Sequence, residues 1–282
     1  MATLGCSADR IKSLKPQELE ARLEGDSRGE FLLLDVRQPE EYAEGHIPGA
    51  VLMPLGELDA RQWELPRDKK IILYCRAGRR SISGAIALCS LGFQELYHLD
   101  GGISAWPYAR LKGLPEDRPS LVSSASSHRD VLMLSIKLEK GSVEFYSRAT
   151  EKVASGTAKE LFKTLAAVEE RHMRKVYDRA VGLLGRGSLP EWEELKTSLK
   201  VDYMEGGIEV APALSGIPEH LEDEMEALEM AIEREYRSYD FYQRASVFVS
   251  DYDTRAFLHK LSTEERWHVE VLLNRIAELT RK

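Results

Sequence analysis

One cysteine of this chain has neighbours that would make it a nucleophile. Cys75 follows the apolar run 71–74, and the residues after it are Arg-Ala-Gly-Arg-Arg-Ser, ahead of a helical stretch. A strand, a glycine-containing loop and a helix N-terminus direct backbone N–H groups and the positive end of the helix dipole toward the sulfur. The three arginines of the loop add positive charge. Because these features favour the thiolate, the residues predict a nucleophilic cysteine.

A rival chemistry for such a cysteine is the hydrolysis of phosphate esters. Phosphatases of that kind place an arginine after five intervening residues, and this position is Ser81 here, with Arg80 one residue too early. The tighter loop suits a sulfur atom or an oxyanion smaller than a phosphoryl group. The two other cysteines, Cys6 and Cys89, form no CxxC pair. We therefore expect no disulfide framework and no cysteine-bound zinc or iron, and we expect Cys89 to be a core thiol.

A second set of reactive residues lies in the C-terminal half, which contains an internal repeat. Residues 135–149 align with 231–245, and residues 165–172 align with 261–268, both at an offset of 96. In the first and third helical stretches a glutamate interrupts an apolar stripe, and in the second and fourth a Glu-x-x-His pair does so. These six residues are Glu139, Glu169, His172, Glu235, Glu265 and His268.

The six side chains of the repeat would point into one core. Unpaired ionised carboxylates in an apolar interior each cost on the order of several kcal/mol, so a positive partner is required. Glu-x-x-His places a carboxylate and an imidazole one turn apart on a single helix face, and two such pairs with two further glutamates make a ligand set for two metal ions. Carboxylate and imidazole donors suit iron, with manganese or zinc as substitutes.

These two sets of residues require two different folds. Apolar runs at 31–35, 70–75 and 95–99 alternate with helical stretches, which predicts an α/β domain with a mostly parallel central sheet and flanking helices. The C-terminal half is helical throughout, and two helix pairs joined by the long connection 184–222 predict an all-α four-helix bundle with one crossover. The expected domains are 1–115 and 131–282, with a Ser-rich linker at 116–130.

Composition and charge restrict the remaining classes of protein. A chain of 282 residues, 43% hydrophobic and 30% charged, is typical of a globular protein with two domains. A net charge of −8 argues against binding to nucleic acid. No apolar run approaches the ~20 residues that cross a membrane. We therefore expect a soluble, cytoplasmic protein.

The N-terminal residues resemble the rhodanese family. The motifs that carry the resemblance, in the family's order and spacing, are Leu34-Asp-Val-Arg, Glu41-Tyr-Ala-Glu-Gly-His-Ile-Pro-Gly-Ala, Tyr74-Cys-Arg-Ala-Gly-Arg-Arg-Ser and Leu99-Asp-Gly-Gly-Ile-Ser-Ala-Trp. The resemblance implies a sulfurtransferase that carries sulfane sulfur as a persulfide on Cys75. Its donor would be thiosulfate or a persulfide, and its acceptor a thiol.

The rhodanese resemblance also assigns roles within the loop. Arg76 and Arg80 would attract the anionic donor, and the loop amides would cradle the sulfur. The other residues of this substrate loop are Ala77, Gly78, Arg79 and Ser81. Asp35, Arg37 and His46 are expected to brace the loop rather than to react.

Residues 131–282 resemble the ferritin-like di-iron bundle of the rubrerythrin group. The resemblance implies that the six repeated residues bind two iron ions, and that Tyr146 and Tyr242, each seven residues after a ligand glutamate, contact those ligands. Such a site would reduce peroxide or oxygen. Its electrons would come from an external donor, because the four-cysteine electron-delivery domain of rubrerythrins has no counterpart in this sequence. The family's extra carboxylate on the third helix is replaced here by Ser238.

Two functions from different classes follow. The bundle is either an oxidoreductase coupled to the sulfurtransferase, or a non-catalytic dimerisation or metal-storage module of a sulfur relay protein. Rubrerythrin-like bundles are usually dimers, so we expect a homodimer. Its expected contact surface lies in the crossover, at Tyr203, Met204, Ile208 and Val210.

Overall fold

The structure, a computed structural model, describes residues 6–24, 30–114, 127–218, 221, 224–249 and 251–281. The chain forms two compact units, which divide between the segments 30–114 and 127–218, except that Gln243–Phe248 group with the first unit. Most of the predicted linker lies outside the described residues. The first helix of the second unit begins at His128, slightly before residue 131, where we expected the bundle to start.

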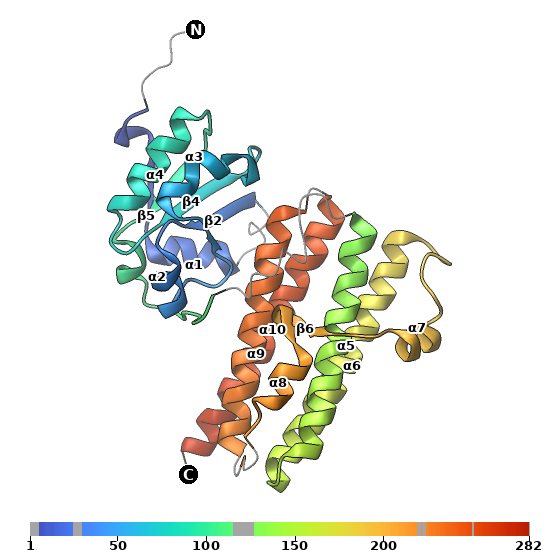
Figure 1. Cartoon of the computed structure of the whole chain (residues 1–282). Helices are drawn as coiled ribbons and strands as arrows, with labels where there is room; N and C mark the ends of the chain where they lie inside the picture. The colour runs from blue at the N-terminus through green and yellow to red at the C-terminus, as the bar shows by residue number, and fades with distance from the viewer. Residues whose placement is uncertain are drawn as a thin grey trace. The chain divides into compact units, whose positions relative to one another are not determined.

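The first unit is built around a five-stranded parallel sheet (Figure 1). Its strands are β1 Lys12–Leu14, β2 Phe31–Asp35, β3 Val51–Leu52, β4 Lys70–Tyr74 and β5 Leu96–Leu99, in the spatial order β1-β5-β4-β2-β3. Every residue of β2 is buried, as expected for a parallel strand covered on both faces. The predicted α/β class is confirmed.

Helices and short 3₁₀ turns flank this sheet. They are η1 Ala8–Arg10, α1 Pro16–Glu24, α2 Pro39–Glu44, η3 Leu55–Glu57, α3 Leu58–Arg61, η4 Gln62–Glu64, α4 Arg79–Ser90 and η5 Gly102–Ala105. The sequence did not predict β1, β3 or α3, because segments of 3, 2 and 4 residues carry no readable periodicity.

One covalent feature contradicts the sequence expectation. Cys6 and Cys89 form a disulfide, with their Cα atoms 5.8 Å apart. Cys6 precedes η1 and Cys89 lies in the last turn of α4, so the bond joins segments 83 residues apart in sequence. The expectation of Cys89 as a core thiol was therefore wrong, and the expectation of no disulfide framework missed this one bond. No local pattern shows that these two segments meet.

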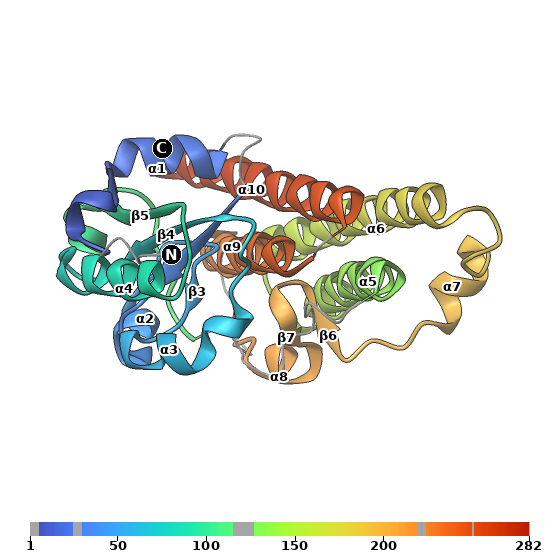
Figure 2. The same cartoon turned by 90° about the horizontal axis from the view of Figure 1, so that it is seen from above.

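The second unit is a bundle of four long helices, α5 His128–Lys152, α6 Gly156–Leu184, α9 Glu224–Phe248 and α10 Tyr252–Thr280 (Figures 1 and 2). The second helix of each hairpin begins on its own cap: Ser155 accepts from the Ala158 N–H, and Asp251 accepts from the Thr254 N–H. The two caps stand 96 residues apart, so the sequence repeat is a repeat of helical hairpins. In the described part of the chain, no helix has the length and apolar character that crossing a bilayer requires.

The crossover between the hairpins is structured. It contains α7 Trp192–Ser198, β6 Tyr203–Met204, η6 Glu205–Gly207, β7 Ile208–Glu209 and α8 Val210–Ser215. β6 and β7 pair antiparallel, and both views show them beside α5 (Figures 1 and 2). We call residues 203–209 the strap.

The strap and Val210, the first residue of α8, pack into the core of their own bundle. Met204 and Val210 are buried in one apolar cluster with Phe145 and Phe162. The expectation that Met204 and Val210 form a contact surface for a second subunit was therefore wrong. The bundle already covers these two side chains.

Candidate functional site

Cys75 stands directly after β4, in the loop that leads into α4. Gly78 makes the turn with φ 94°, a backbone conformation that favours glycine, and its N–H donates to Cys75 Sγ at 3.2 Å. Ser81, buried in the first turn of α4, donates its hydroxyl to the Gly78 carbonyl at 2.8 Å. Ala77 is exposed in the same loop. The sulfur therefore lies at a helix N-terminus and receives a backbone N–H, as the sequence pattern predicted.

A glycine turn after β5 holds the backbone of this loop. The Ile103 N–H donates to the Cys75 carbonyl at 2.8 Å, and the Ser104 N–H donates to the Arg76 carbonyl at 3.0 Å. Gly102 has φ 59°, and a β-carbon at this position would lie 2.3 Å from the Cys75 carbonyl oxygen. This close approach explains why a glycine stands at position 102.

The three arginines of the loop have different surroundings. Arg76 and Arg79 are exposed, whereas Arg80 forms a two-pronged ion pair with Glu41, both N···O distances being 2.6 Å. The hydrogen bonds from Arg80 lower the pKa of Glu41 to about 2. The guanidinium of Arg80, which we expected to attract an anionic donor, is therefore already neutralised. The exposed cations near Cys75 in sequence are Arg76 and Arg79.

A buried ion pair supports the helix that carries Glu41. Arg37 Nη2 lies 2.7 Å from Asp35 Oδ2. The same guanidinium donates to the carbonyls of Glu41 and Gly45, both at 2.8 Å. His46 is also buried. Asp35 and Arg37 thus brace α2, and through Glu41 they hold the Cys75 loop.

In the second unit the six repeated residues come together in the bundle core, and all six are buried. Donor atoms of Glu139, Glu169 and His172 lie within 4.8 Å of one another, and those of Glu169, Glu235 and His268 do the same. A third group of equal span joins Glu265 to both histidines. Glu169 and Glu265 therefore lie between two potential metal positions.

These side chains lack partners that a metal-free core would have to provide. Both oxygens of Glu169 and of Glu265, one oxygen of Glu139 and His172 Nδ1 have no hydrogen-bond partner among the described residues. Burial, followed by neighbouring carboxylates, raises the pKa of Glu139 and Glu169 well above the usual range. Buried polar atoms in proteins almost always have a hydrogen-bond partner. Carboxylate and imidazole groups that lack one in the described part of the chain are the donors that divalent metal ions prefer. The residues present therefore fit a pair of metal ions.

Both histidines direct Nδ1 toward the carboxylates. His172 Nδ1 lies 3.5 Å from Glu265, while its Nε2 lies 2.9 Å from Glu264. His268 Nδ1 lies 3.0 Å from Glu235. Burial lowers the pKa of both imidazoles, but the carboxylates bonded to them outweigh burial and raise it to about 9 for His172 and about 10 for His268. Glu264, which sequence reasoning missed, holds the orientation of the His172 ring.

The two tyrosines connect the helix pairs reciprocally. The Tyr146 hydroxyl donates to Glu235 at 2.9 Å, and the Tyr242 hydroxyl donates to Glu139 at 3.4 Å. Both phenols are buried. Tyr146 on α5 therefore contacts a glutamate on α9, and Tyr242 on α9 contacts a glutamate on α5. This symmetry follows from the repeat, because α5 and α9 are equivalent helices.

A further carboxylate from the strap joins this cluster. Glu205 is buried, and one of its oxygens lies within 4.8 Å of oxygens from Glu139 and Glu265. Burial, followed by neighbouring carboxylates, raises the pKa of Glu205 to about 8. Sequence reasoning missed Glu205 because a crossover has no helical periodicity. Its position between Met204 and two glycines was the available sign of close packing.

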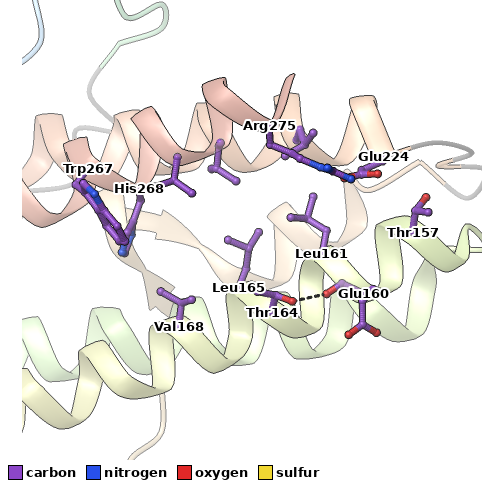
Figure 3. A pocket seen from close by; sticks show the side chains of 13 residues that line it. Thr157, Glu160, Leu161, Thr164, Leu165, Val168, Glu224, Trp267, His268 and Arg275 are labelled. Atoms are coloured by element: carbon purple, nitrogen blue, oxygen red, sulfur yellow. Dashed lines mark hydrogen bonds and ion pairs between the residues drawn. The ribbon is translucent and has the colours of Figure 1, made fainter. Parts of the chain in front are cut away.

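An apolar groove between α6 and α10 reaches the metal ligands. A cavity of about 480 Å³ has His268 near one end and Arg275 near the other (Figure 3). Val168 lines the groove, and its counterpart in the 96-residue repeat is Glu264. His172 therefore has a carboxylate neighbour where His268 has the groove, and the two halves of the site are not equivalent.

Comparison with known proteins identifies one family in each half of the chain. The rhodanese-like domain family matches residues 15–109, and the rubrerythrin family matches residues 130–276. A sulfurtransferase from Allochromatium vinosum is 35% identical over 96 residues, which cover 34% of this chain and 88% of that protein. A rhodanese-related protein from Thermoplasma volcanium, known from its crystal structure, is 29% identical with a TM-score of 0.33, over 36% of this chain and 98% of that one.

The rubrerythrin match spans about half of the chain and includes all six repeated ligand candidates. The rhodanese match includes Cys75 and its loop. The chain therefore belongs to the rubrerythrin family in its C-terminal half, and its N-terminal part is a rhodanese-like domain.

Proposed function

We propose that this protein is a sulfurtransferase that carries sulfane sulfur as a persulfide on Cys75. The main support is the Cys75 sulfur at the N-terminus of α4, with the Gly78 N–H bonded to it. The thiolate attacks the outer sulfur of thiosulfate or of a persulfide, and the S–S bond of the donor breaks. Sulfite or a thiolate leaves with the electron pair. Arg76 and Arg79, both exposed, attract the anionic donor.

The sulfur then passes to a thiol from outside the chain. The acceptor thiolate, or cyanide in an assay, attacks the outer sulfur of the persulfide and releases the Cys75 thiolate. Cys6 and Cys89 are joined in a disulfide, and Cys75 is the free cysteine. Because no second thiol of the same chain is available, the acceptor has to be a small thiol or the thiol of a partner protein.

Thiosulfate:cyanide sulfurtransferase activity tests this function. Cys75→Ser should abolish activity, whereas the double variant Cys6→Ser with Cys89→Ser should retain it. Mass spectrometry of the wild-type chain after incubation with thiosulfate should show the gain of one sulfur atom. Activity that persists in Cys75→Ser would exclude Cys75 as the sulfur carrier.

We also propose that the bundle binds two iron ions and reduces peroxide or dioxygen. The two oxygens of Glu169, which have no hydrogen-bond partner among the described residues, support metal binding. When bound, iron would supply the redox chemistry, with electrons from an external donor. The phenols of Tyr146 and Tyr242 hold protons at Glu235 and Glu139. The groove at His268 offers small molecules an approach to the ligands.

Metal analysis and peroxide turnover by one preparation test this second activity. The wild-type chain should hold two iron ions, and the double variant Glu169→Ala with Glu265→Ala should hold none. The reduced, iron-loaded chain should consume peroxide rapidly. Metal that is bound but inert toward peroxide would favour the storage or dimerisation module instead.

A further inference from the structure

We propose that Glu205 on the strap is a direct ligand of one of the two metal ions, the one near Glu139 and His172. This role depends on the di-metal site proposed above. It gives the crossover a chemical function, because the strap would contribute a carboxylate to a site otherwise made by the four long helices.

The position of the Glu205 carboxylate is that of a ligand. The residue is 3% exposed, and its Oε1 has no hydrogen-bond partner among the described residues. Its Oε2 accepts from the Ser142 hydroxyl at 3.0 Å. One of its oxygens lies within 4.8 Å of oxygens of Glu139 and Glu265. Three ionised carboxylates at this spacing in a buried site would repel one another, and a metal ion bound among them would offset that repulsion.

The strap is fixed to the bundle on both sides of Glu205. On α5, a β-carbon at Gly141 would lie 2.1 Å from the Tyr203 carbonyl oxygen, so the two backbones are in contact. On the other side, Gly206 of the strap has φ 75°, and a β-carbon there would lie 2.9 Å from the Cβ of Arg237 on α9. These two glycines allow the strap to reach the helices, and they place Glu205 between them.

The repeat explains why a single carboxylate enters at this point. Ser142 and Ser238 are equivalent at the offset of 96, each one turn after a ligand glutamate. Ser142 binds Glu205, and the backbone of Ser238 lies against Gly206. A long side chain at either position would occupy the space of the strap. The strap therefore brings a carboxylate to a point where α5 and α9 themselves carry the short side chains of Ser142 and Ser238.

One consequence is that the two metal positions differ in their ligands. The position near His172 has Glu205 as an additional donor, and its histidine is held by Glu264. The position near His268 has neither neighbour among the described residues, and its histidine lies at the groove. The two ions should therefore bind with unequal affinities.

Titration of the metal-free full chain with Fe(II) under anaerobic conditions tests this role, with calorimetry to measure affinity and stoichiometry. Glu205→Gln should bind one ion as the wild type does and the other at least about tenfold more weakly. The matched control is Glu209→Gln, the same substitution on the same strap at a partly exposed position, which should bind both ions normally. Glu205→Asp, which keeps the charge, should weaken one ion less than Glu205→Gln does.

Thermal unfolding of the metal-free variants separates a ligand from a structural anchor. If Glu205 is a ligand, its carboxyl in the metal-free chain is buried among other carboxylates and contributes nothing to stability that an amide would not, so metal-free Glu205→Gln should melt at or above the wild-type temperature. A lower melting temperature would show that Glu205 merely anchors the strap through Ser142, and wild-type affinity for both ions would also overturn the role. If the wild-type chain itself bound no metal, the di-metal site would fail as a whole.

Discussion

Glu41 determines how the arginines around Cys75 are used. Its carboxylate lies 2.6 Å from two nitrogens of Arg80, and its own carbonyl accepts from Arg37. The lowered pKa of Glu41, about 2, means that this pair is intact above its ordinary pKa of 4.5 and is lost as the pH falls through about 2. Arg80 therefore positions the loop, while Arg76 and Arg79 face the solvent that brings the donor.

Glu41→Gln should lower kcat/KM for thiosulfate by roughly tenfold to a hundredfold, because a loop that loses its anchor no longer holds the sulfur in the attacking geometry. Steady-state sulfurtransferase assays would measure this effect. The control is Glu57→Gln, which removes a comparable but more exposed ion pair with Arg61 in the same domain. Equal activity of Glu41→Gln and the wild type would show that Arg80 needs no partner.

Among the elements, the strap requires a glycine on the helix that it crosses, at Gly141 of α5. Gly141 lies in the middle of α5, where glycine is a poor helix former, yet any side chain there would meet the backbone of Tyr203 and Met204. The glycine is therefore retained for the close approach of a strand to a helix, at some cost to the helix itself.

Gly141→Ala should lower the free energy of unfolding of the bundle by about 1–3 kcal/mol, because the new methyl group pushes the strap away. Gly182→Ala in α6 is the matched control, since nothing lies within 4 Å of a β-carbon there. That substitution should raise the stability by up to about 1 kcal/mol. Denaturant unfolding followed by circular dichroism would compare the two, and equal effects would contradict the close contact.

At the scale of the whole molecule, the metal site links stability to pH. Burial raises the pKa of Glu205 to about 8, and carboxylate partners raise the pKa of His172 to about 9. A group with a raised pKa stabilises the fold fully below its unfolded pKa and ceases to do so as the pH rises through its folded pKa. The free energy of unfolding of the metal-free chain should therefore fall with rising pH from near pH 4.5, the ordinary pKa of a glutamate, to about pH 9. Glu265, with a pKa of about 2, acts in the opposite direction at lower pH.

The metal-free chain should therefore melt at a progressively lower temperature from about pH 5 to about pH 8, while the metal-loaded chain changes less. Scanning calorimetry of both forms would show the gap between them widening with pH. A metal-free transition that is constant or rises over this range would argue against a cluster of buried carboxylates.

We also predict that the full chain is a homodimer, as its family resemblance implies. Because Met204 and Val210 are buried within their own bundle, Met204→Ala should disturb folding rather than dissociate a dimer. Sedimentation velocity of the wild-type chain should give the dimer mass. A monomer at all accessible concentrations would refute the prediction.

Local patterns in the sequence were sufficient to predict a large part of this protein. The apolar run at Phe31–Asp35 became β2, because a buried parallel strand needs apolar residues on both faces. The offset of 96 identified six buried residues on four helices, since helical periodicity specifies which side chains share a face. The position of Cys75 between a strand and a helix was likewise evident from neighbouring residues alone.

Only the tertiary structure decided which distant segments meet. The disulfide between Cys6 and Cys89, the neutralisation of Arg80 by Glu41 and the entry of Glu205 into the bundle each join segments that no periodic pattern relates. Periodicity determines which face of an element is buried, but it does not determine which residue of another element lies opposite. That choice depends on the packing of the whole chain. The tertiary structure therefore revealed Glu41 at the Cys75 loop and Glu205 at the bundle site, which local patterns did not predict.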